Sequence, residues 1–249
     1  MSECPLCDGT GWRPVEKNGV RAVEVCSCRR HVRDEQWWIE QARIPSAFRS
    51  KDLKDFWVVD NSKPLQWAKM SAIDFIDRYP LVEKGLFFLG SPGVGKTHLT
   101  VAILKQLMIE KGVPCLFCSY QELLRQIRDS YNPVSLSTES DVVRPVLETE
   151  VVAIDDLGAE RISDWVEDTV TYILNYRYAQ KKITLLTSNL PDAPADGVEP
   201  EAGSSPSRVH RDSLTDRIGL RVRSRLHEMC TLVRVHAKDY RQTVQEHRR

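Results

Sequence analysis

Short apolar runs and amphipathic stretches alternate along the chain from residue 85 onward. The apolar runs at residues 86–89, 113–118, 151–154 and 183–187 have the length of buried strands. Helical periodicity follows in the segments at residues 97–110, 121–129, 165–180 and 213–228. Strands that are apolar throughout and alternate with helices are typical of a parallel sheet covered on both faces. The pattern therefore predicts an α/β fold.

The remaining segments have different patterns. Residues 34–43 and 64–79 are helical in periodicity, whereas residues 1–33 are rich in Cys and Gly. Residues 191–207 consist mostly of Pro, Gly, Ala and Ser, which predicts a flexible loop. We expect three parts: a small unit at 1–33, a helical lead-in at 34–84 and the α/β domain at 85–249.

Composition and charge narrow the class of protein. The chain has 249 residues, with 35 Lys and Arg against 35 Asp and Glu, so its formal net charge is zero. A uniformly basic DNA-coating protein is excluded, although local charged patches are not. No apolar run approaches the roughly 20 residues that cross a bilayer, and the N-terminus does not resemble a secretory signal. We expect a cytoplasmic protein without a membrane segment, whose seven cysteines are not disulfide-bonded.

The segment at residues 90–97 fits the P-loop pattern G-x-x-x-x-G-K-[ST] in full, with a predicted strand before it and a helix after it. Its glycines let the backbone N–H groups face phosphates, and the helix N-terminus adds a positive partial charge. We expect Lys96 to reach the β- and γ-phosphates of ATP and the Thr97 hydroxyl to coordinate Mg²⁺. The alternative is an incidental glycine turn. The predicted nucleotide-binding residues of the loop are Gly90, Ser91, Pro92, Gly93, Val94, Gly95, Lys96 and Thr97.

Polar residues follow two of the other predicted strands. Asp155 and Asp156 come directly after the apolar run at 151–154, and Asn189 follows the run at 183–187. Beside a P-loop, Asp155 is the expected Mg²⁺ partner and Asp156 is suited to orient and activate an attacking water. Asn189 is placed to sense the γ-phosphate and hold that water. The alternatives are a solvated strand end for the acids and an ordinary strand-to-loop cap for Asn189.

An arginine-rich helix is predicted near the C-terminus. Arg217, Arg221 and Arg225 are spaced by four residues, which places all three on one face of a continuous helix. Such a row suits an arginine finger that reaches a neighbouring subunit's nucleotide, or a phosphate-backbone contact, or simply a solvated basic face. Arg241 follows at the end of Asp239-Tyr240-Arg241 and is a candidate contact to the nucleotide of its own subunit.

Four cysteines near the N-terminus form two pairs, Cys4 with Cys7 and Cys26 with Cys28. Two such pairs separated by a loop predict a Cys₄ zinc site, although the second pair has the spacing C-x-C. His31 is an alternative to Cys28, and unliganded thiols are the alternative to zinc. The other three cysteines, Cys115, Cys118 and Cys230, are predicted to be core thiols, the first two on opposite faces of a strand.

Together these segments resemble the DnaC/DnaI helicase loaders and the similar IstB-type transposon helpers, which are AAA+ ATPases. The likeness covers most of residues 44–241. It is carried by Ile44-Pro45-Ser46-Ala47-Phe48, by Gly85 through Leu99, by Asp155-Asp156-Leu157-Gly158, by Thr187-Ser188-Asn189 and by Arg217 through Leu226.

The resemblance implies roles for particular residues. It implies a five-stranded parallel sheet of order 5-1-4-3-2, an arginine finger at Arg221 with Arg225 as second candidate, and a sensor at Arg241. It also implies that His98 belongs to the nucleotide-binding segment. At Asp156 most AAA+ proteins carry Glu, and because Asp is one methylene shorter we expect slow hydrolysis.

Three functions are compatible with these features. The first is a helicase loader that hydrolyses ATP, self-associates through the ATP site, docks its zinc unit on a hexameric replicative DNA helicase and holds single-stranded DNA. Arg125, Arg128 and Tyr131 are candidate DNA contacts, although an ordinary amphipathic helix explains them equally well. The second is an IstB-type helper that binds duplex DNA and recruits a transposase. The third is a small-molecule kinase, which would need no arginine finger.

Overall fold

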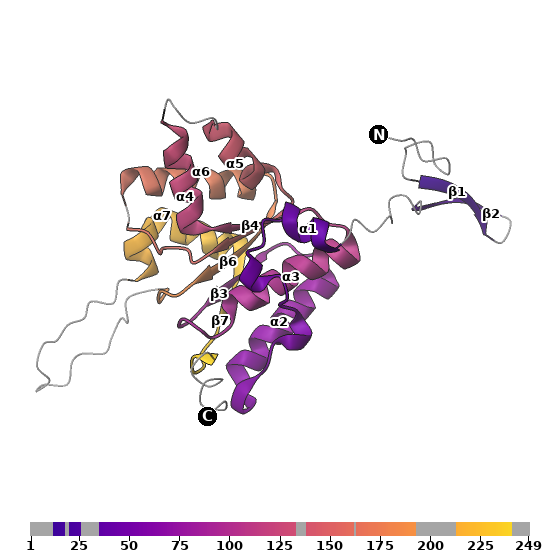
Figure 1. Cartoon of the computed structure of the whole chain (residues 1–249), viewed down its shortest axis with the longest axis horizontal. Coiled ribbons are helices and arrows are strands. Elements are labelled where there is room, and N and C mark those ends of the chain that lie inside the picture. Colours follow the sequence, from indigo (N-terminus) through magenta and orange to yellow (C-terminus); the bar gives the residue numbers. More distant parts are fainter. Residues whose placement is uncertain are drawn as a thin grey trace, which may run out of the picture.

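The computed structural model describes residues 12–17, 20–25, 35–132, 138–161, 163–192 and 213–240. Five strands form one sheet, with helices packed on both of its faces (Figure 1). The helices are α1 (Glu35–Gln41), α2 (Lys63–Arg78), α3 (Lys96–Lys111), α4 (Tyr120–Ser130), α5 (Glu139–Glu148), α6 (Asp164–Ala179) and α7 (Leu214–Met229). The strands are β1 (Trp12–Lys17), β2 (Val20–Val25), β3 (Gly85–Leu89), β4 (Cys115–Ser119), β5 (Val151–Asp155), β6 (Ile183–Ser188) and β7 (Cys230–Arg234).

The five-stranded sheet is parallel throughout, in the order β4-β5-β6-β3-β7. Numbered along the chain from β3, this is the expected order 5-1-4-3-2, so the predicted α/β fold is confirmed. The order places β3 between β6 and β7, and the carboxyl ends of β3, β5 and β6 therefore meet at one edge. In such sheets ligands bind at this edge, where the strand order reverses.

Alternation along the strands divides the buried side chains into two cores. Phe88 faces α1, α2 and α3, whereas the neighbouring Phe87 faces the core that α4, α5, α6 and α7 complete. Cys115 and Cys118 belong to opposite cores, as predicted. Burial raises the pKa of the Cys118 thiol, and that of the likewise buried Cys230, to about 12, which keeps both thiols protonated.

The lead-in before β3 packs on the same core as the sheet. Ile39 of α1, Ile44 and Phe56 of the following turns, and Phe75 of α2 are buried with Phe88. Between α1 and α2 the chain makes three short 3₁₀ turns, at Ser46–Phe48, Leu53–Asp55 and Val59–Asn61. The domain boundary expected at residue 85 stays a prediction, although the packing is continuous across it.

Four elements were not predicted from the pattern. The hairpin of β1 and β2 lies within the stretch that we expected to be a loop, and Asn18-Gly19, which separates its strands in the sequence, is a strong hairpin signal. Helix α5 begins at a capping box formed by Thr138 and Asp141, and Pro145 inside it obscures the helical pattern. Strand β7 is as long as β3, β4 and β5, but only two of its five residues are buried, so it has no continuous apolar run.

The expectation of one continuous arginine helix is wrong. Gly219 interrupts α7 with φ 79° and ψ 159°, so Arg217 precedes the break and Arg221 follows it. The positive φ is a conformation that L side chains rarely adopt, which explains why glycine stands here; a Cβ at this position would also lie 2.4 Å from Oε1 of Glu167. The helical spacing of four therefore relates Arg221 to Arg225 but not to Arg217.

Several predictions fall outside the described residues. These are the four cysteines of the zinc site, the alternative ligand His31, most of the loop at 191–207, and Arg241. Among the helices that the structure describes, none is long and apolar enough to cross a membrane.

Candidate nucleotide-binding site

The P-loop connects the carboxyl end of β3 to the start of α3. Gly95 has φ 95°, a left-handed conformation that an L side chain rarely adopts, and it directly precedes Lys96, the first residue of α3. At Gly90 an added Cβ would lie 1.9 Å from the carbonyl oxygen of Val235, so this glycine is required by the close approach of the chain after β7. The loop is thus shaped by contacts that only glycine permits.

Lys96 is the charged centre of the loop. Its side chain is buried, and Nζ donates to the carbonyl oxygens of Gly90 and Ser91 at 2.8 Å each and to Oδ1 of Asn189 at 2.6 Å. Asn189 follows β6, the strand that lies beside β3. The sheet order therefore brings together two residues that the sequence separates by 93 positions.

Asp155 ends β5 beside the P-loop threonine. The Thr97 hydroxyl donates to its two carboxylate oxygens at 2.9 and 3.1 Å, and the Thr187 hydroxyl donates to Oδ1 at 2.7 Å. Burial raises the pKa of Asp155 and the neighbouring charge of Asp156 adds to this, while the two hydroxyl hydrogen bonds and Lys96 oppose it. A carboxylate and a hydroxyl side by side are the oxygen donors that Mg²⁺ takes in proteins, so this pair fits the ion.

Asp156 lies one residue beyond the sheet and is held from β6. Its φ of 57° is unusual for a residue other than glycine. Its N–H donates to Oγ1 of Thr187 at 2.9 Å, and its Oδ1 accepts from Nδ2 of Asn189 at 2.7 Å. The predicted pair of Asp156 and Asn189 is thus in contact. Thr187 was not predicted as a site residue. Its hydroxyl, at the end of the strand next to the one that carries the two carboxylates, is the feature that could have indicated it.

A cavity of about 460 Å³ adjoins the P-loop. It is also lined by Phe48, Phe56 and Trp57 from the lead-in, together with Ala237 and Tyr240 from the segment after β7. His98, at the start of α3, also lines it, and its Nε2 lies 2.8 Å from the carbonyl oxygen of Asp52. Burial lowers the pKa of His98, which favours the neutral imidazole at neutral pH. The aromatic and aliphatic walls suit a nucleoside base.

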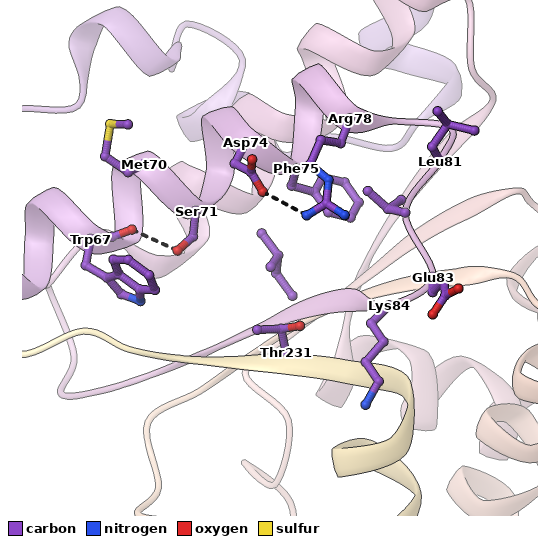
Figure 2. Close-up of a pocket in the computed structure, with 12 residues that line it drawn as sticks. Trp67, Met70, Ser71, Asp74, Phe75, Arg78, Leu81, Glu83, Lys84 and Thr231 are labelled. Carbon is purple, nitrogen blue, oxygen red and sulfur yellow. Dashed lines mark hydrogen bonds and ion pairs between the residues drawn. The ribbon is translucent and has the colours of Figure 1, made fainter.

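A larger hollow lies elsewhere and shares no residue with this cavity. It measures about 800 Å³ and is lined by α2 and by the start of β3 and β7 (Figure 2). Trp67 and Met70 form one of its walls and Thr231 lies opposite them (Figure 2). Because no P-loop residue contributes to it, volume alone does not identify the nucleotide site.

Arg221 and Arg225, the two candidates for the arginine finger, do not line the nucleotide cavity of their own chain. Arg225 donates from Nε to Oδ1 of Asn175 at 2.9 Å, pairs with Glu228 and lies 4.2 Å above the Tyr178 ring. Arg221 is exposed and, among the described residues, makes no hydrogen bond or ion pair. Of the two, Arg221 is therefore the one available to another molecule.

The candidate DNA-contacting residues on α4 are partly neutralised. Arg125 forms ion pairs with Glu122 at 2.7 Å and with Asp129 at 3.1 Å on the same helix. Arg128 lies 4.9 Å from the centre of the Trp165 ring, and Tyr131 meets the same ring edge-on. Arg125 is thus poorly placed to neutralise a phosphate, whereas the aromatic cluster remains suited to stacking.

The sheet order, the P-loop and the acid–asparagine pair define an AAA+ ATP-binding fold. The chain belongs to the family of IstB-like ATP binding proteins, whose profile matches residues 22–198. It is 26% identical over 197 residues to the phage-like element PBSX protein XkdC of Bacillus subtilis, covering 76% of this chain and 72% of XkdC. It is 30% identical over 189 residues to the replicative helicase loader DnaI of the same organism, covering 72% of this chain and 59% of DnaI.

The fold is also similar to a solved structure of a loader. The crystal structure of the DnaC helicase loader superimposes with a TM-score of 0.62 and 30% sequence identity. The match covers 77% of this chain and the whole of that chain. The resemblance to the helicase-loader family is therefore confirmed at the level of family and fold.

Replacing Lys96 with alanine is expected to weaken ATP binding by about a hundredfold, because a hydrogen bond to a charged partner contributes about 1.5–3 kcal/mol. Titration calorimetry with ATP measures the change. Lys84 to alanine is a matched control, since Lys84 lies at the hollow of Figure 2 and not in the nucleotide cavity. Equal ATP affinity in the Lys96 variant and the unmodified protein would contradict the assignment.

Proposed function

We propose that this protein is an ATPase that loads a hexameric replicative DNA helicase onto single-stranded DNA. The observation that carries the proposal is the match to the whole chain of the DnaC helicase loader, together with the P-loop, Asp155, Asp156 and Asn189 at one edge of the sheet. The similarity to the replicative helicase loader DnaI supports the same partner. The family and the sheet order argue against a small-molecule kinase.

We assign the hydrolytic step to residues at the edge of the sheet. Asp156 would accept a proton from a water molecule whose oxygen bonds to the γ-phosphorus, while the bond between that phosphorus and the β–γ bridging oxygen breaks, giving ADP and phosphate. Asn189 would hold both the Asp156 carboxylate and the water. When bound to Thr97 and Asp155, Mg²⁺ would offset the phosphate charge. Slow turnover follows from the short Asp156 side chain.

Assembly and docking belong to other parts of the chain. We propose that protomers associate through the ATP site, with Arg221 completing the neighbour's site, and that Arg241 contacts the nucleotide of its own protomer. Cys4, Cys7, Cys26 and Cys28 would hold Zn²⁺, and this unit would dock on the helicase in the cytoplasm. Arg128 and Tyr131 would contact single-stranded DNA, with Trp165 as a further stacking surface.

The proposal is tested by mixing the purified protein with the replicative helicase of its own organism and measuring particle mass, with and without ATP. We expect a defined complex that forms with the unmodified chain and is lost in the Cys4→Ser, Cys7→Ser double variant. The control is the Cys115→Ser variant, whose thiol is buried in the sheet. If the protein instead assembles on duplex DNA with ATP and ignores the helicase, the alternative of an IstB-type transposition helper replaces the loader.

A further inference from the structure

One wall of the nucleotide cavity is built from the lead-in between α1 and α2. Phe48, Lys51, Phe56 and Trp57 all line the cavity and all lie in this segment. Its regular structure is limited to three 3₁₀ turns of three residues each. Such short turns contain few internal hydrogen bonds, so the position of the wall depends on what ties it to the ATPase core.

Two lysines tie this segment to the helices. Lys69 of α2 donates from Nζ to the carbonyl oxygen of Phe56 at 3.0 Å, and Lys105 of α3 is the buried one of the two. Only 2% of the residue is exposed, which is rare for lysine. Its Nζ donates to Oδ1 of Asp52 at 2.7 Å and to the carbonyl oxygen of Arg49 at 2.9 Å, and it lies 3.3 Å from Oε1 of Glu35. Three acceptors match the three donors of an ammonium group. One buried cation therefore joins α3 to α1 and to the segment that forms the wall.

The same turn contacts the start of α3 directly beside the P-loop. The carbonyl oxygen of Asp52 lies 2.8 Å from Nε2 of His98, and the His98 ring meets the Phe56 ring edge-on at 5.4 Å between centroids. Phe56 also packs so closely on Gly95 that a Cβ there would lie 2.6 Å from its ring. Asp52 is thus held by Lys105 through its side chain and faces His98 through its backbone.

We propose that Lys105 is a positioning residue that fixes the base-side wall of the nucleotide cavity through Asp52. The inference rests on nucleotide binding, which is part of the proposed function, but it needs neither hydrolysis nor a helicase. Without the ammonium group, the Asp52 carboxylate and the Arg49 carbonyl lose their shared partner, and the wall occupies its binding position for a smaller fraction of the time. The apparent affinity for a ligand falls in proportion to that fraction.

The test compares ligands with and without a base. In the Lys105→Met variant, calorimetry is expected to show ATP and ADP binding weakened by about tenfold. This is the loss expected if the wall occupies its binding position for about a tenth of the time. Binding of inorganic tripolyphosphate, measured in the same way, is expected to stay unchanged, because the P-loop keeps its own contacts. A general loss of packing would weaken the binding of all three ligands.

Lys111→Met is the matched control. Lys111 lies on the same helix and also donates to backbone carbonyl oxygens, among them that of Tyr79 at 2.7 Å. These carbonyls lie at the end of α2 and not in the wall of the cavity. Its nucleotide affinity is expected to equal that of the unmodified protein. The Asp52→Asn variant, which keeps the shape of the turn, is expected to weaken the binding of ATP and ADP, as Lys105→Met does.

The outcomes separate this inference from the proposed function. Unchanged ATP affinity in both the Lys105 and Asp52 variants would overturn the inference and leave the proposed function intact. An equal loss of tripolyphosphate and ATP binding would also overturn it, because Lys105 would then support the whole domain. If the unmodified protein bound no ATP, the proposed function and the inference would fail together.

Discussion

Replacing Arg221 with alanine is expected to reduce ATP hydrolysis by the assembled protein about a thousandfold, the lower end of the effect of an arginine finger. Arg221 lies on α7 outside the nucleotide cavity of its own chain, and the described residues offer it no hydrogen bond or ion pair. Its charge is thus available to a neighbour's γ-phosphate. ATP affinity of the isolated protomer is expected to stay the same, as measured by calorimetry beside a phosphate-release assay.

Two comparisons sharpen this prediction. Arg225→Ala is expected to have a much smaller effect, because Asn175, Glu228 and Tyr178 already engage that guanidinium. Mixing Arg221→Ala with Asp156→Asn protomers is expected to restore part of the activity, since one supplies the acid and the other the finger at a shared interface. Full activity of Arg221→Ala alone, or no recovery on mixing, would rule out a finger that acts between protomers.

Replacing Arg177 with methionine is expected to lower the free energy of unfolding by about 4 kcal/mol, because each buried acceptor left unpaired costs about 1–3 kcal/mol. Arg177 is fully buried on α6. Its guanidinium donates to the carbonyl oxygens of Val146 at 2.7 Å, Thr149 at 2.9 Å and Ile183 at 2.5 Å, and to Oγ1 of Thr184 at 2.9 Å. One side chain thus joins the end of α5 to the start of β6.

Urea unfolding followed by tryptophan fluorescence measures this loss. Burial lowers the pKa of Arg177 to about 10, so the guanidinium remains charged at neutral pH and its donors are all present. Arg144→Met is the control, because Arg144 pairs with Glu148 on an exposed face of α5, and such pairs contribute about 0.3–0.5 kcal/mol. A loss at Arg177 no larger than at Arg144 would show that the buried network does not stabilise the fold.

Local pattern was sufficient where neighbours in sequence decide the structure. Strands β3, β4, β5 and β6 were predicted because runs such as residues 151–154 are apolar throughout, and the P-loop because its glycines and Lys96 stand at fixed spacing. The pattern failed where a distant contact overrides it. Gly219 is compatible with a helix in the sequence pattern, yet in the fold, where α7 packs on α6, its backbone leaves the helical conformation and separates Arg217 from Arg221.

The α/β class, the P-loop, the acids at the end of β5 and the core placement of Cys115 and Cys118 could all be predicted from the sequence. Which of these residues meet depends on the tertiary structure. Asn189 reaches Lys96 and Asp156 because the strand order places β6 between β3 and β5. Lys105 looks like an ordinary helical lysine in the sequence, and it holds the wall of the cavity only because α1 and the turn at Asp52 fold over it. Spacing fixes local conformation, whereas contacts between residues dozens of positions apart depend on how the layers pack.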